Sequence, residues 1–174
     1  MARELLTYLD YAENDYKFFR ESYDRDVKGS PLASIGQNIC ERYLKHIIDE
    51  YAEPESDQEI LWKESVLRTH SLHRLMKYLL EEMQLEVPED VEEALDRIDG
   101  FYFSTRYPGA DSFIPTSRDI DKANTAVEKA RNFTLSICHE LDGHDIEESV
   151  DEHQNIENDV QQMTFHDIGD DIDL

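Results

Sequence analysis

Residues 30–51 read SPLASIGQNICERYLKHIIDEY, and their apolar side chains recur at steps of three and four residues. This spacing places the apolar residues on one face of an α-helix. Ser30 suits the N-cap, and Pro31 suits the first helical position, where its missing N–H has no intrahelical partner to lose. The stretch predicts a helix that ends near Tyr51, with an apolar stripe formed by Ile35, Ile39, Tyr43, Leu44, Ile47 and Ile48.

The same spacing recurs along the chain as far as Gly143. Ser56 and Glu59 have the form of a capping box, and Gly143 suits the position after a helix end. No segment alternates apolar and polar residues strongly enough to indicate a strand. The predicted fold is all-α, an antiparallel up-and-down bundle of four to five main helices with an acidic C-terminal tail. Further helices are expected over residues 3–23, 56–62, 72–82, 88–98 and 117–142.

Charge and composition limit the classes of function. The chain has 174 residues, which suits one domain, and its 41 acidic against 17 basic residues give a formal net charge of −24. Such a surface repels nucleic acid and anionic membranes, except at a local basic pocket. No apolar run approaches the roughly 20 residues of a membrane-spanning helix, and the N-terminus lacks the layout of a signal peptide. We therefore expect a cytoplasmic protein that does not associate with membranes.

The acidic residues are concentrated towards the C-terminal end. Residues 132–174 hold thirteen Asp and Glu residues and no Lys or Arg. Few residues there would form a core, so a boundary is predicted near Gly143. Residues 1–142 are expected to form the bundle, and residues 143–174 an acidic, flexible tail.

Histidine and cysteine spacing argues against a metal site. His139 and His144 stand five residues apart, whereas a zinc site of the metalloprotease type needs histidines four apart on one helical face. Cys40 and Cys138 form no CxxC pair, and we expect both to be buried as small apolar residues. The sequence predicts neither a metal site nor a cofactor.

Residues 99–117 have no helical period and are rich in aromatic side chains. Irregular segments of this length are uncommon in compact domains and tend to carry function. Burial of aromatic side chains would keep the segment ordered. We expect it to lie across the bundle with most of its aromatic residues in the core: Phe101, Tyr102, Phe103, Tyr107 and Phe113.

Four short motifs together resemble one known family. They are YAENDY at residues 11–16, QNICERYLK at residues 37–45, THSL at residues 69–72 and RYPG at residues 106–109. In this order and at these intervals, over residues 3–142, the chain resembles the HEPN (higher eukaryotes and prokaryotes nucleotide-binding) family. The resemblance implies a helical bundle that forms a homodimer. It also implies a nucleotidyltransferase-like protein partner, often in a toxin–antitoxin or related defence system.

Many HEPN proteins are metal-independent ribonucleases with an arginine followed, after four to six residues, by a histidine. The arginine neutralises the scissile phosphate while the histidine transfers a proton near neutral pH. After Arg106 no histidine follows until His139, so this chain resembles an RYPG-containing subgroup that lacks the motif. Arg68 and His73 have a matching spacing, but they lie outside the family's motif region.

Five residues of these motifs are candidates for ligand binding: Arg106, Tyr107, His70, Glu41 and Lys45. A guanidinium group binds phosphate, and tyrosine rings stack on a nucleotide base. Such chemistry would let the bundle hold a nucleotide between its helices.

Each of these residues also has a purely structural interpretation. Arg106 would pair with an acid such as Asp15 or Glu41 and pin the connecting segment. His70 would hydrogen-bond the backbone in the first turn of a helix, and Tyr107 would belong to a turn at residues 107–109. Glu41 and Lys45 stand four residues apart, which would support a helix at its surface.

Two functions from different classes follow. The first is a non-catalytic HEPN module, a homodimer that binds a nucleotide or a partner protein through Arg106; the missing histidine and the acidic charge favour it. The alternative is a metal-independent endoribonuclease with a non-standard site made of Arg106 and either His70 or His73. A third possibility is that the tail imitates nucleic acid in a basic cleft of the protein or a partner.

Overall fold

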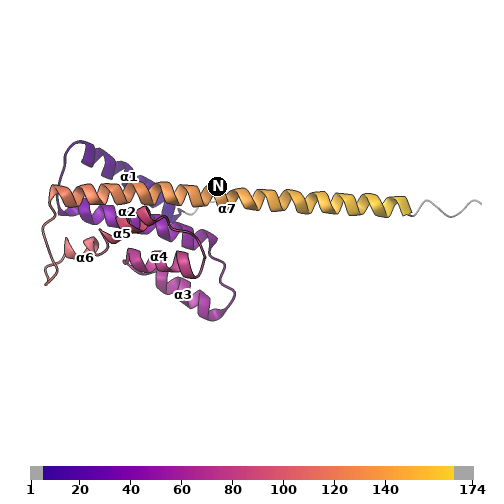
Figure 1. Ribbon diagram of the computed structural model, residues 1–174, viewed down its shortest axis with the longest axis horizontal. Coiled ribbons are helices and arrows are strands. Elements are labelled where there is room, and N and C mark those ends of the chain that lie inside the picture. The colour runs from indigo at the N-terminus through magenta and orange to yellow at the C-terminus, as the bar shows by residue number, and fades with distance from the viewer. Residues whose placement is uncertain (1–5, 167–174) are drawn as a thin grey trace, which may run out of the picture. The chain divides into compact units, whose positions relative to one another are not determined.

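A computed structural model describes the backbone of residues 6–166 and the side chains of residues 6–143. Over that range the protein is all-α, as predicted, and contains no strand (Figure 1). The sequence predicted most of these helices to within a few residues at each end. The helices within it are α1 (Tyr8–Asp24), α2 (Ser30–Tyr51), α3 (Asp57–Leu67), α4 (Leu72–Glu81), α5 (Glu89–Asp96), α6 (Phe101–Ser104) and α7 (Ser117–His166).

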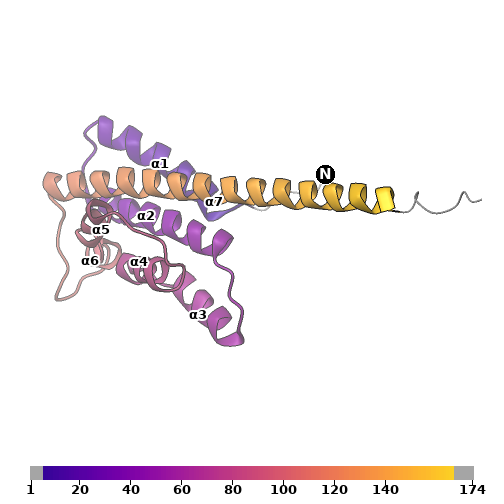
Figure 2. The ribbon, with the colours of Figure 1, turned by 45° about the vertical axis from the view of Figure 1, so that its right-hand side comes forward.

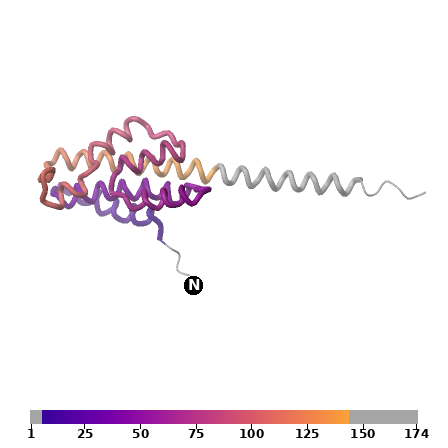
Figure 3. The backbone as a smooth tube through the Cα atoms, turned by 90° about the horizontal axis from the view of Figure 1, so that it is seen from below, coloured from indigo at the N-terminus to yellow at the C-terminus, as the bar shows by residue number. Residues whose placement is uncertain are grey.

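Helix α2 is the central helix of the bundle. It contacts α1, α3, α4 and α6 (Figure 2), and it also runs alongside the first part of α7 (Figure 3). Neighbours on several sides bury far more of α2 than the single apolar face expected from its sequence. The fully buried side chains include Ile39, Cys40, Tyr43, Leu44, Ile47 and Ile48.

Helix starts follow the capping signals in the sequence. Ser56 and Glu59 form the predicted capping box at the start of α3, and Ser71 caps α4. At α2 the N-cap is Gly29 rather than Ser30, while proline occupies the first turn as expected. The side chain of a cap satisfies backbone N–H groups that have no intrahelical partner, which is why these signals are readable in a single sequence.

The segment at residues 99–117 differs from the expectation in two respects. It contains the single-turn helix α6, preceded by Gly100 in a left-handed conformation with φ of 96°. Its aromatic residues are mostly not in the core: Phe101 is buried, whereas Phe103, Tyr107 and Phe113 are exposed. A single helical turn at the edge of a bundle can present only one face to the interior, so most of its rings remain at the surface.

Gly143 does not end the last helix, contrary to the prediction, because α7 continues to His166. A glycine inside a helix costs only about 1 kcal/mol relative to alanine, so its presence alone does not terminate one. Packing divides the chain after Ile137, and the domain boundary after residue 142 stays a prediction. The predicted flexibility of residues 143–174 also stays a prediction, and the last eight of them lie outside the described residues.

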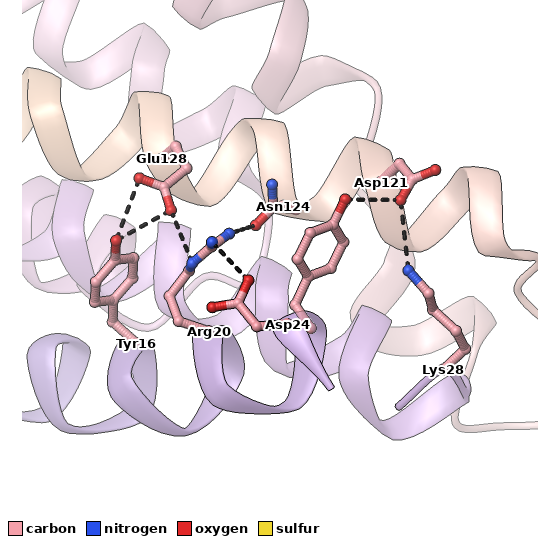
Figure 4. A network of polar contacts seen from close by, with 8 residues as sticks. Tyr16, Arg20, Asp24, Lys28, Asp121, Asn124 and Glu128 are labelled. Atoms are coloured by element: carbon pink, nitrogen blue, oxygen red, sulfur yellow. Dashed lines mark hydrogen bonds and ion pairs between the residues drawn. The ribbon is translucent and has the colours of Figure 1, made fainter. Parts of the chain in front are cut away.

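Polar contacts join α1 to the first part of α7 (Figure 4). The Tyr16 hydroxyl donates to Glu128 at 3.0 Å, and the Tyr23 hydroxyl donates to Asp121 at 2.9 Å. The Arg131 guanidinium donates to Glu13 at 2.8 Å. Burial raises the pKa of Glu13, but hydrogen bonds from Arg131 and Tyr43 outweigh it, so this pKa lies below its usual value.

The two cysteines differ in their surroundings. Cys40 is fully buried, as predicted, and burial raises the pKa of its thiol. Cys138 is only half-buried. None of the helices within the described range has the length and apolar character needed to cross a membrane.

At Gly36, α2 packs closely against its neighbours, and this close packing can be tested. A Cβ atom at this position would lie 3.0 Å from the Cβ of Ala123 and 3.2 Å from the ring of Phe19. We expect Gly36→Val to lower the free energy of unfolding by about 1–3 kcal/mol, because overpacking forces the helices apart. Urea unfolding measures this. Gly109→Ala is the control, because a Cβ there meets nothing within 4 Å; equal stability of both variants would contradict this account.

Candidate functional site

Four of the five candidate residues come together in one cluster. We call Glu41, Lys45, His70, Tyr102 and Arg106 the His70 cluster. Its residues come from α2, from the turn before α4, and from α6 and the turn after it, and α2 packs against both α4 and α6. Residues far apart in the sequence therefore meet on one side of the central helix.

Glu41 and Lys45 form a buried ion pair. The Lys45 ammonium donates to the Glu41 carboxylate at 2.6 Å, and the two residues are only 4% and 5% exposed. The prediction of a surface pair was therefore wrong. Four-residue spacing identifies two side chains on one helical face, but it does not say whether that face is covered, and α2 is covered on several sides.

His70 joins this pair to an aromatic ring. Its Nδ1 lies 3.1 Å from the second oxygen of the Glu41 carboxylate. Its imidazole stacks on the Tyr102 ring, with 4.4 Å between ring centres and 8° between planes, and the Phe103 ring meets it edge-on at 5.6 Å. The prediction that the ring bonds the backbone was wrong. With Nδ1–H donating to Glu41, Nε2 is the nitrogen left to accept a hydrogen bond.

Arg106 rests on aromatic rings. Its guanidinium carbon lies 4.7 Å from the ring centre of Tyr102 and 5.7 Å from that of Tyr107. It forms no ion pair with any acid whose side chain the structure describes; Asp15 pairs with Arg42, and Glu41 with Lys45. The structural interpretation of Arg106 was therefore wrong. Cation–π contact leaves the guanidinium N–H groups free to bind an anion.

An open pocket of about 370 Å³ lies beside Arg106. Tyr107 and Phe113 line it with aromatic side chains. Ser104 and Thr105 also line it, and their hydroxyls donate to the backbone carbonyls of Gly100 and Phe101. Tyr107 is 53% exposed. The hydrogen-bonded turn in this region spans residues 109–112 instead of the expected 107–109. One cation, aromatic faces and hydroxyl groups thus surround a space open to solvent.

Arg68 and His73 lie outside the cluster. The Arg68 side chain is 79% exposed and pairs with Glu64, while His73 is 69% exposed and faces Asp96 at 3.8 Å. A site made of Arg106 and His73 is therefore not formed within the described part of one chain. No group of three or more side chains suited to a metal ion is found among the residues whose side chains are described.

Asp99 ties the base of the connecting segment to the start of α4. Its carboxylate accepts hydrogen bonds from the Ser71 hydroxyl at 3.0 Å, the Leu72 N–H at 2.9 Å and the His73 N–H at 3.2 Å. The two N–H groups belong to the first turn of α4, where a backbone N–H has no acceptor within the helix. The three residues that follow His70 are thereby linked to the segment that carries Tyr102 and Arg106.

One known family model matches part of the chain. Residues 60–141 match the HEPN domain family model. This HEPN match includes His70, Arg106 and Tyr107, whereas Glu41 and Lys45 precede it. It supports the resemblance to the HEPN family seen in the four motifs. No curated protein and no solved structure matches the chain significantly.

Two residues of this region were not predicted as part of a site. Tyr102 was expected only in the core, yet its ring contacts both His70 and Arg106. Gln37 belongs to the stretch QNICERYLK and is fully buried, but a glutamine on a helix gives no indication of its partners. The sequence offered one indication that Gln37 lies near the site: it precedes Glu41 by four residues and so shares its face of the helix.

The buried ion pair leads to a test of stability. Lys45→Met leaves the Glu41 carboxylate buried without its ammonium partner, and we expect a loss of about 3–5 kcal/mol in the free energy of unfolding. The double variant Glu41→Leu/Lys45→Met removes both charges and should be more stable than the single variant. Chemical denaturation measures both.

The control for this test is an exposed pair with the same spacing. Arg97 and Glu93 lie 2.8 Å apart with side chains 60% and 57% exposed, so Arg97→Met should change the stability by less than about 1 kcal/mol. If Lys45→Met costs no more than Arg97→Met, the buried pair does not stabilise the fold.

Proposed function

We propose that the protein is a non-catalytic HEPN-type module that binds a nucleotide in the pocket beside Arg106. The observation that carries this proposal is the guanidinium group of Arg106, held on the Tyr102 and Tyr107 rings without a carboxylate partner among the described side chains. In a chain with 41 acidic and 17 basic residues, a cation left unpaired at an open pocket favours an external anion.

Phosphate and base would be bound by different parts of the pocket. Arginine presents its N–H groups in a fixed fork that suits two phosphate oxygens. The exposed ring of Tyr107 offers a face for stacking a nucleobase in the same pocket. The arrangement therefore favours a ligand that carries an anionic group close to a planar ring.

Net charge favours a small ligand over a polymer. Long nucleic acids bind through many phosphate contacts to several cations, whereas this pocket has Arg106 as its only charged lining residue and the chain carries −24 overall. The proposal extends to a cytoplasmic homodimer with a nucleotidyltransferase-like partner in a toxin–antitoxin or defence-like system. The HEPN match supports this extension.

Nucleotide binding is tested by neutralising the guanidinium. We expect Arg106→Gln to weaken the binding of GMP at least tenfold, because a charge-assisted hydrogen-bonded contact of about 1.5–3 kcal/mol is lost. Isothermal titration calorimetry with wild type, Arg106→Gln and Arg97→Gln measures it. Arg97 is an exposed arginine paired with Glu93, so Arg97→Gln should bind as wild type does. Equal affinity of all three proteins would refute the proposal.

A second candidate function is supported by a specific contact. His70 and Arg106 both lie within 5 Å of the centre of the Tyr102 ring. An endoribonuclease needs a group that takes a proton from the ribose 2′-hydroxyl and a cation that stabilises the phosphate. The Nε2 of His70, with Nδ1 directed at Glu41, and the guanidinium of Arg106 would fill these roles without a metal ion.

The two candidates differ in their effect on RNA. We expect no RNA cleavage that depends on Arg106 or His70, because the acidic chain repels a polyanion. Labelled tRNA and mRNA are incubated in EDTA with wild type, Arg106→Gln, His70→Asn and Arg97→Gln, and the products are separated on a denaturing gel. Cleavage by wild type and Arg97→Gln that disappears in both site variants would replace the binding module by the endoribonuclease.

A further inference from the structure

Gln37 connects the two backbone segments of the His70 cluster. It lies in α2 four residues before Glu41 and is fully buried. Its side-chain amide nitrogen donates to the backbone carbonyl of His70 at 2.7 Å, and the backbone N–H of Tyr102 donates to its amide oxygen at 2.7 Å. One side chain thus bonds to two segments that lie more than thirty residues apart in the sequence.

Both backbone groups need a partner from elsewhere in the protein. Tyr102 is the second residue of α6, where a backbone N–H has no intrahelical acceptor. His70 precedes Ser71, the N-cap of α4, so its carbonyl lies outside the helix. A primary amide carries a donor and an acceptor on one planar group, which a carboxylate or a hydroxyl on an equally long side chain does not provide.

The residues that Gln37 holds are the two whose rings stack. His70 and Tyr102 lie parallel at 4.4 Å, and the Tyr102 ring in turn contacts Arg106. We propose that Gln37 is the positioning residue of this site: it fixes the separation of the His70 and Tyr102 backbones, and through them the place of the Arg106 guanidinium. The effect of Gln37 on ligand binding rests on the proposed nucleotide-binding function.

Two substitutions separate this role from simple filling of the core. Gln37→Met keeps the length of the side chain and removes both hydrogen bonds. Gln37→Glu keeps the acceptor for the Tyr102 N–H but faces the His70 carbonyl with an oxygen. Tyr16→Phe is the matched control, because it removes a hydrogen bond between α1 and α7 that does not involve the cluster.

The first measurement needs no ligand. An imidazole stacked on a tyrosine ring shows ring-current shifts of its proton signals in NMR, and Tyr102→Leu gives their unstacked positions. In both Gln37 variants of the full chain, the His70 ring signals should move at least halfway to those positions, while Tyr16→Phe leaves them in place. Unchanged His70 signals in either variant would overturn the proposal. Failure of both variants to fold would also overturn it, in favour of a purely structural role.

The second measurement is GMP affinity by calorimetry. We expect both Gln37 variants to bind GMP about tenfold more weakly than wild type, as loss of one or two hydrogen bonds implies, and Tyr16→Phe to bind normally. If wild type binds GMP and the Gln37 variants bind it equally well, the positioning role is wrong and nucleotide binding stands. If wild type does not bind GMP, the proposed function fails, and the His70 signals alone decide the role of Gln37.

Discussion

The buried ion pair between Glu41 and Lys45 is the constraint on which the rest of the candidate site depends. Two charges in the interior of a bundle lose their hydration, so each must find partners that compensate. Lys45 satisfies one carboxylate oxygen of Glu41, and the imidazole of His70 satisfies the other. His70 therefore serves a requirement of the core with one ring nitrogen, while its ring stacks on Tyr102, whose ring contacts Arg106.

Both apolar and polar contacts hold the helices of the bundle together. Aliphatic side chains of α2 are buried beside the polar Gln37, Glu41 and Lys45, and polar contacts of tyrosines, carboxylates and arginines join α1 to α7 (Figure 4). Five of the described arginines form ion pairs with acids, either within one helix or between helices: Arg20, Arg42, Arg68, Arg97 and Arg131. Arg74 also lies over an aromatic ring, that of Trp62, but it donates to Ser65. Arg106 differs from it because its guanidinium, held on two tyrosine rings, lines an open pocket.

Sequence alone predicted the helices well and the side-chain contacts poorly. Apolar spacing and capping residues act within a few positions of each other, so Ser56 with Glu59 or the stripe of α2 could be read directly. The partners of His70 and Arg106 depend on how helices pack, which no local pattern encodes. The same limit explains why Glu41 and Lys45 were placed at the surface. Gly143 was taken for a helix end for another reason: a glycine often follows a helix, but its presence alone does not terminate one.

The three hydrogen bonds of Asp99 have a mechanical consequence. They connect the N-terminal turn of α4 to the segment that leads into α6. Gln37 makes a second connection, because its amide bonds the backbones of His70 and Tyr102. Neither segment can shift alone without breaking bonds at both points. The start of α4 and the segment that leads into α6 are therefore tied together at two separate points, and a displacement that parts them must break both sets of hydrogen bonds.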